Sequence, residues 1–151
     1  MQKVHSILGS QRFGVRLLSS TFGILFFTSL LAAQYEGWTI PPTAKTEKNP
    51  MTGVADAAKK GKSVFTGKCQ RCHGSEGKGN GPEADPNVKP ADLTQIKSDI
   101  NPDGVLFYKI WNGHQPHAGS KGQMPAFKVQ LVREDVWRVV EFVKTLWKPA
   151  T

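Results

Sequence analysis

The sequence predicts an all-helical domain with long loops, and three observations support this prediction. Apolar residues recur at helical spacing in several segments, no segment alternates apolar and polar residues convincingly as a strand does, and no internal repeat is visible. The chain has 151 residues, which suffices for one domain, since domains usually contain about 100–150 residues. We therefore expect one hydrophobic core.

The first 33 residues have the organisation of an export signal. Three basic residues precede a mainly apolar run over residues 17–33, which ends in small side chains. The cleavage site is imperfect, because Leu31 lies close before a cut after Ala33. An uncleaved membrane anchor is the rival interpretation, although several Ser and Thr residues weaken the run. Both interpretations place the remaining chain outside the cytoplasm, in the periplasm of a bacterium.

The elements expected after this segment follow in order. Residues 34–51 have no helical or strand periodicity and predict an extended linker. Residues 54–68 predict a helix with Gly61 on its apolar face. Glycine costs about 1 kcal/mol relative to alanine inside a helix, a cost that close approach of another backbone would offset. Residues 74–90 are rich in glycine and proline and predict a loop.

The second half of the chain predicts further helices. A short helix is expected within residues 92–100, and a clearer one over residues 102–111, where a proline stands in the first turn and Gly113 follows the end. A loop over residues 114–127 then precedes the last helix, at residues 133–147, whose valines form one apolar stripe.

The two cysteines and the histidine after them form the candidate functional motif. Cys69 and Cys72 are too close in sequence to act as a disulfide framework, and His73 follows them directly. This spacing is typical of haem attachment, in which the cysteines bind the two vinyl groups of one porphyrin as thioethers and the histidine binds the iron from below. A zinc site would need further ligands, for which His114 and His117 are the candidates. A redox-active dithiol would need a parallel sheet beside it.

The second axial ligand of the iron is chosen by elimination. A thioether opposite histidine stabilises ferrous iron and raises the reduction potential. Met1 lies in the export segment and Met51 precedes the first helix, whereas Met124 lies in a loop before the last helix, with a proline after it. Met124 is therefore the expected ligand. His114 and His117 are the competing ligands and would give a bis-histidine haem of lower potential.

Residues 52–146 resemble the class I c-type cytochromes, of the bacterial exported type. The matching residues are Gly61, Phe65, Cys69-Gln-Arg-Cys72-His73-Gly74, Gly77-Lys-Gly79-Asn-Gly81-Pro82, Pro90-Ala-Asp92-Leu93, Met124-Pro125-Ala126-Phe127 and Asp135-Val-Trp137 through Phe142. The resemblance implies a cytochrome c-like domain at residues 52–151, with about four helices and long loops wrapped round one covalent haem c.

The resemblance also implies two contacts. Gly61 would pack against the last helix near Phe142, and a proline carbonyl, that of Pro90, would orient His73 through its second ring nitrogen. The chain departs from the family at Arg133, where a capping Ser, Thr or Asp is common, so the last helix is expected to start loosely. The histidine-rich segment 113–123 is longer than is usual in the family.

The function expected from these features is one-electron transfer without catalysis, because two filled axial positions leave no site for a substrate. The formal net charge is +8, or +5 without residues 1–33, and it is not gathered into a block of the kind that binds nucleic acid. An acidic redox protein is the expected partner. The alternatives are a haem subunit tethered to a membrane oxidase or dehydrogenase complex, and a haem sensor or enzyme that binds a small ligand.

Overall fold

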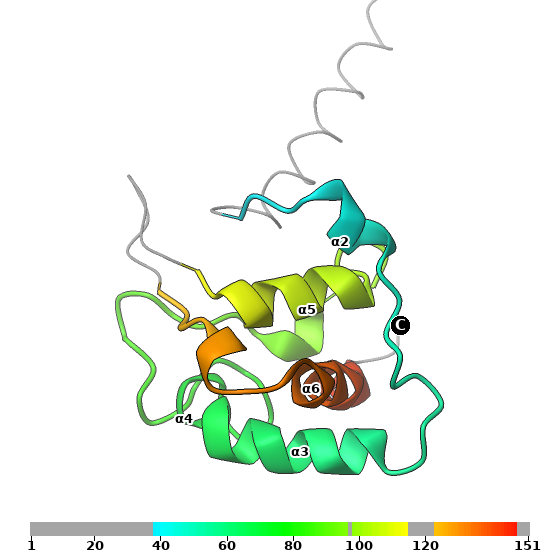
Figure 1. Ribbon diagram of the computed structural model, residues 1–151. Coiled ribbons are helices and arrows are strands. Elements are labelled where there is room, and N and C mark those ends of the chain that lie inside the picture. The colour runs from blue at the N-terminus through cyan, green and yellow to red at the C-terminus, as the bar shows by residue number, and fades with distance from the viewer. Residues whose placement is uncertain (1–37, 97, 115–122, 148–151) are drawn as a thin grey trace, which may run out of the picture. The chain divides into compact units, whose positions relative to one another are not determined.

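A computed structural model describes residues 38–96, 98–114 and 123–147, and this part of the chain is helical without a strand (Figure 1). The export segment and His117 lie outside the described residues. The elements are α2 (Pro42–Thr46), α3 (Ala57–Lys68), α4 (Gln70–His73), α5 (Asp103–Asn112) and α6 (Arg133–Thr145), with 3-10 turns η1 (Leu93–Gln95) and η2 (Phe127–Val129). The predicted all-helical fold is confirmed. Within the described residues, no helix has the length and apolarity needed to cross a membrane.

The core is built round α6, which lies between α3 and α5 (Figure 1). Gly61 of α3 faces the backbone of α6 so closely that a Cβ atom there would collide with the carbonyl oxygen of Arg138. One turn further along both helices, the rings of Phe65 and Phe142 lie 5.0 Å apart. The close approach expected at Gly61 is therefore present, at Arg138, one turn before Phe142.

The other side of α6 packs on α5. Leu106 and Phe107 of α5 form a buried cluster with three residues of α6, Val136, Trp137 and Val140. The rings of Phe107 and Trp137 are stacked with centroids 4.1 Å apart. Helix α6 is thus apolar on two sides, which is what its stripe of valines and aromatic residues indicates.

The segment before α3 differs from the prediction. Residues 42–46 form α2 where an extended linker was expected, because Pro42 begins a helix readily and tertiary packing stabilises the turn. The buried Ala44 lies against α5, where Gly104 leaves room for its carbonyl. The buried Asn49 donates a hydrogen bond to the carbonyl of Trp137 at 3.1 Å. The described part of this segment is therefore packed on the helical core.

Helix α6 begins without a side-chain cap, as the sequence predicts, but it is anchored in another way. The guanidinium of Arg133 donates to the carboxylate of Glu47 at 2.7 Å and lies 4.4 Å from the ring centroid of Phe107. Glu134 and Asp135 add negative charge at the positive end of the helix dipole. The start of α6 is thus held by contacts with the segment before α3 and with α5.

The other boundaries differ by a few residues from those expected. Helix α3 begins at Ala57 because a turn with Asp56 in the left-handed region (φ 60°) precedes it. In the described part of residues 92–100, which excludes residue 97, the short helix that was expected is only the turn η1. Asp92 accepts a hydrogen bond there from the amide of Thr94 at 2.9 Å.

The contact between α3 and α6 predicts opposite effects for two glycines of the same helix. Gly61→Ala should lower the free energy of unfolding by about 1–3 kcal/mol, because its methyl group has no room against the backbone of α6. Gly67→Ala is the matched control, since a Cβ there meets no atom within 4 Å, and it should raise stability by up to about 1 kcal/mol. Denaturant unfolding of both variants measures the difference. Equal effects would show that α3 does not approach α6 at Gly61.

Candidate functional site

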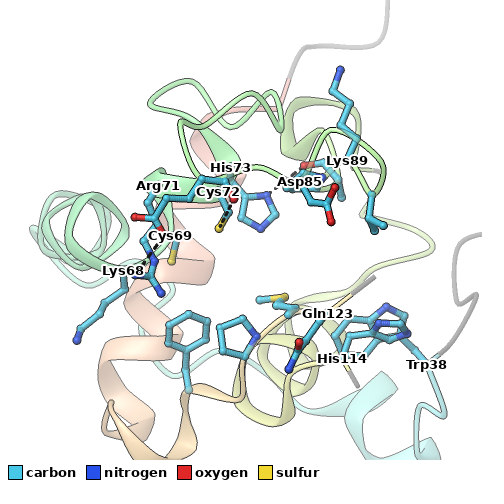
Figure 2. A pocket seen from close by; sticks show the side chains of 17 residues that line it. Trp38, Lys68, Cys69, Arg71, Cys72, His73, Asp85, Lys89, His114 and Gln123 are labelled. Atoms are coloured by element: carbon cyan, nitrogen blue, oxygen red, sulfur yellow. Dashed lines mark hydrogen bonds and ion pairs between the residues drawn. The ribbon is translucent and has the colours of Figure 1, made fainter. Parts of the chain in front are cut away.

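A cavity of about 540 Å³ lies between the region of α4 and the chain that precedes η2 (Figure 2). Its size is within the range of about 300–1,000 Å³ found for small-molecule and cofactor sites. Its lining consists of Trp38, Lys68, Cys69, Arg71, Cys72, His73, Glu83, Asp85, residues 88–91, His114, residues 123–125 and Phe127. Figure 2 shows His73 on one side of the cavity and His114 and Gln123 on the other.

The cysteines and the histidine come together because one turn of helix carries all three. Cys69 ends α3 and precedes α4, and its carbonyl accepts hydrogen bonds from the amides of Cys72 at 3.1 Å and His73 at 2.9 Å. The turn places the two thiols and the imidazole along the same wall (Figure 2). The structure thus brings together the three residues singled out from the sequence motif.

A backbone carbonyl orients His73. Its Nδ1–H donates to the carbonyl of Ala91 at 3.1 Å, so the acceptor is not Pro90, which the family resemblance implied, but the next residue. Burial lowers the pKa of His73, against the opposing effect of the Ala91 carbonyl, and favours the neutral ring. A neutral imidazole that donates from Nδ1 presents the lone pair of Nε2, which is the form that binds a metal.

The glycine-rich loop closes over the end of α4. The amide of Gly79 donates to the carbonyl of His73 at 2.8 Å, and the amide of Gly81 donates to the carbonyl of Cys72 at 3.0 Å. Gly79 has a φ of +70°, and a Cβ there would collide with the carbonyl of Pro90. The loop therefore satisfies the last carbonyls of the motif and fits tightly against the segment that orients His73.

The opposite wall is built round Met124. Its amide and carbonyl exchange hydrogen bonds of 2.9 and 2.8 Å with His114, which makes an antiparallel bridge between the two residues. Gly113, with a φ of +64°, leaves room for the Met124 carbonyl. Met51 packs instead against the core cluster formed by residues of α5 and α6. Of the two methionines in the described residues, Met124 is the one that lines the cavity, and His114 lines it too.

Sequence reasoning missed Trp38 as a residue of the site. It lies in the segment predicted to be an extended linker, where no motif marks it, and yet it lines the cavity. Its ring lies 5.0 Å from that of His114, at an interplanar angle of 42°. An isolated aromatic residue in a segment without periodicity is the only signal that the sequence offers.

The competing interpretations of the cysteines fit less well. Burial, together with the neighbouring Cys72, raises the pKa of Cys69 to about 12, whereas a redox-active dithiol needs a lowered one. Within the described ranges, no group of three or more His, Cys, Asp or Glu side chains is arranged to hold a metal ion, as a zinc site would require.

The residues present fit a covalent haem. Two thiols stand where they can meet two vinyl groups, a neutral imidazole lies beside them, and a thioether lines the same cavity from the other wall. Cys69 and Cys72 would hold the porphyrin, and His73 and Met124 would bind its iron. The apolar walls, which include Val88, would keep water from the group.

Comparison with known proteins agrees with this chemistry. A family model described as "Cytochrome c" matches residues 58–147, which is more than half of the chain. The match runs from α3 to the residues that follow α6 and includes the cysteine motif and Met124. A search of curated proteins finds no match.

Covalent attachment through both cysteines is the first prediction from this site. After denaturation in acid acetone, the haem should stay with the polypeptide, and the intact mass should exceed that of the chain by one haem. Cys72→Ala should keep haem through one thioether, and the double variant C69A/C72A should release it. Free haem from the wild-type protein, or a preparation with zinc and no iron, would contradict this assignment of the motif.

Proposed function

The chain belongs to the cytochrome c family, and on that premise we propose that it is an exported carrier of single electrons and not an enzyme. Members of the family bind covalent haem c, and the group supplies an iron that alternates between the ferric and ferrous states. The observation that carries the proposal is that His73 and Met124 line one cavity from two walls, beside both cysteines.

Each residue has a distinct task in this proposal. Cys69 and Cys72 would keep the group attached outside the cytoplasm, where a released cofactor would be lost by dilution. His73 would hold the iron through Nε2, because Nδ1 donates to the carbonyl of Ala91. The thioether of Met124 would stabilise the ferrous state and raise the reduction potential. If both residues hold the iron, no position remains on it for a substrate.

Basic side chains at the cavity support an acidic redox partner. Lys68 and Lys89 are among the residues that line the cavity (Figure 2), and the side chains of Lys59, Lys60, Lys62, Lys78 and Lys128 are exposed. Lys121 precedes Met124 in the sequence by three residues and lies outside the described residues. Lys78 is paired with Glu76 at 2.5 Å, so its charge is partly balanced. We propose that the lysines near the cavity would steer the partner toward the haem site.

The composition of residues 1–33 supports export to the periplasm. Cleavage after Ala33 would release a soluble carrier, and an uncleaved segment would tether the haem domain to a membrane complex. The N-terminal sequence of the mature protein distinguishes these two forms.

Met124→Ala tests the distal ligand and the carrier function together. The variant should keep covalent haem but lose the weak sulfur-to-iron charge-transfer band of the ferric protein, and its potential should fall because the thioether no longer stabilises ferrous iron. The ferrous variant should bind carbon monoxide readily, whereas the wild type should not.

Met51→Ala is the matched control, since Met51 packs in the core, and its band should be intact. If the charge-transfer band survives in M124A, a residue other than Met124 must be the distal ligand of the iron. Rapid carbon monoxide binding by the wild type would favour the sensor or enzyme instead.

Charge reversal tests the docking face. Electron exchange with an acidic redox partner should slow by roughly tenfold as the ionic strength rises to 0.15 M, where the screening length is about 8 Å. Lys68→Glu should make the rate of electron exchange less sensitive to ionic strength. Lys48→Glu, in the segment before α3, should have a smaller effect on that sensitivity. A rate that is independent of salt, or a larger effect of K48E, would show that the partner docks elsewhere.

A further inference from the structure

A residue from outside the match to the family reaches the proposed haem site. The family model begins at residue 58, and Trp38 precedes that position by twenty residues. Its side chain nevertheless lines the cavity on the same wall as His114 and Gln123 (Figure 2). The segment that carries it is therefore placed to act on the site.

Two ring and charge contacts hold the indole of Trp38. Its centroid is 5.0 Å from that of the His114 ring, and the ammonium of Lys109 lies 5.6 Å from the centroid of the indole. Lys109 belongs to α5 and also donates to the side chain of Asn101 at 2.8 Å. A cation over an aromatic face is attracted more strongly where water is partly excluded, and burial lowers the pKa of Lys109 to about 8.

The segment itself is anchored at several points. Ala44 is buried against α5, Asn49 donates to the carbonyl of Trp137, and Glu47 is paired with Arg133 at the start of α6. Trp38 is therefore presented by a segment that is packed on α5 and α6.

The contact with His114 leads directly to Met124. The two residues exchange both backbone hydrogen bonds, and side chains of directly opposed residues in an antiparallel pair lie on the same face. The imidazole of His114 and the thioether of Met124 therefore share the cavity side of the bridge. Because two hydrogen bonds join their backbones, a displacement of His114 would also displace Met124.

We propose that Trp38 is a positioning residue for the distal side of the haem site. It packs on the ring of His114, supports the bridge that presents Met124, and would shield the Met124 thioether from water and competing ligands. The inference rests on the proposed ligation by Met124, and it assigns a role to a segment that the family match does not cover.

The test compares holoprotein variants through two spectroscopic readouts, the ferric charge-transfer band and the affinity of the ferric protein for imidazole. Trp38→Ala should weaken the band and tighten imidazole binding by roughly tenfold, the size of effect usual for residues that support a metal ligand. Trp38→Phe keeps an aromatic ring and should stay close to the wild type. Lys48→Ala, an exposed change in the same segment, should have no effect.

A double-mutant cycle tests the route through His114. His114→Ala should resemble W38A, and the variant W38A/H114A should be no worse than either single change, because both remove one contact. If W38A fails to fold, Trp38→Leu provides the comparison, since it keeps apolar volume without the ring. Equal behaviour of W38A or W38L and the wild type would overturn the inference, as would full additivity in the cycle.

The wild-type spectrum separates this inference from the proposal on which it rests. A wild type with the band and a W38A variant with the same band would overturn only the role of Trp38. A wild type without the band would overturn the ligation by Met124 and the inference with it.

Discussion

The contact between Gly61 and the backbone of Arg138 determines where the parts of the site can lie. Because a glycine permits α3 to approach α6 so closely, the end of α3 and the start of α6 are placed relative to each other by backbone packing and not by flexible side chains. Cys69 follows directly from α3, and Met124 lies shortly before α6. The two walls of the cavity are thus extensions of one helix pair.

The site combines two kinds of attachment on that frame. The cysteine motif is a local device, since one helical turn presents two thiols and an imidazole, and the glycine loop and the Ala91 carbonyl hold that turn in one orientation. The methionine is placed by long-range packing and by its bridge to His114. A cofactor attached to the cysteine motif and also bound by Met124 would connect the two walls of the cavity.

The residues that sequence reasoning predicted well are those whose chemistry is local. The spacing of Cys69, Cys72 and His73 fits one turn whatever the rest of the chain does, and the helices with apolar stripes were predicted to within a few residues. Helix α2 and Trp38 were missed because tertiary contacts determine their placement, α2 against α5 and Trp38 against His114. Such contacts produce no periodic pattern in the sequence. The carbonyl that accepts the hydrogen bond from His73 was expected to be that of Pro90 and is that of Ala91. Every residue type has a backbone carbonyl, so the sequence does not indicate which one is the acceptor.

Proton NMR of the ferrous protein tests most directly whether His73 and Met124 bind one iron from opposite sides. A methionine methyl held against the face of a porphyrin is shifted strongly upfield by the ring current. With methyl-labelled methionine and Met51→Leu to remove the alternative, the account predicts one such three-proton signal, assigned to Met124, in protein that carries one haem per chain. A spectrum without an upfield methyl, or a signal that disappears in M51L, would contradict it.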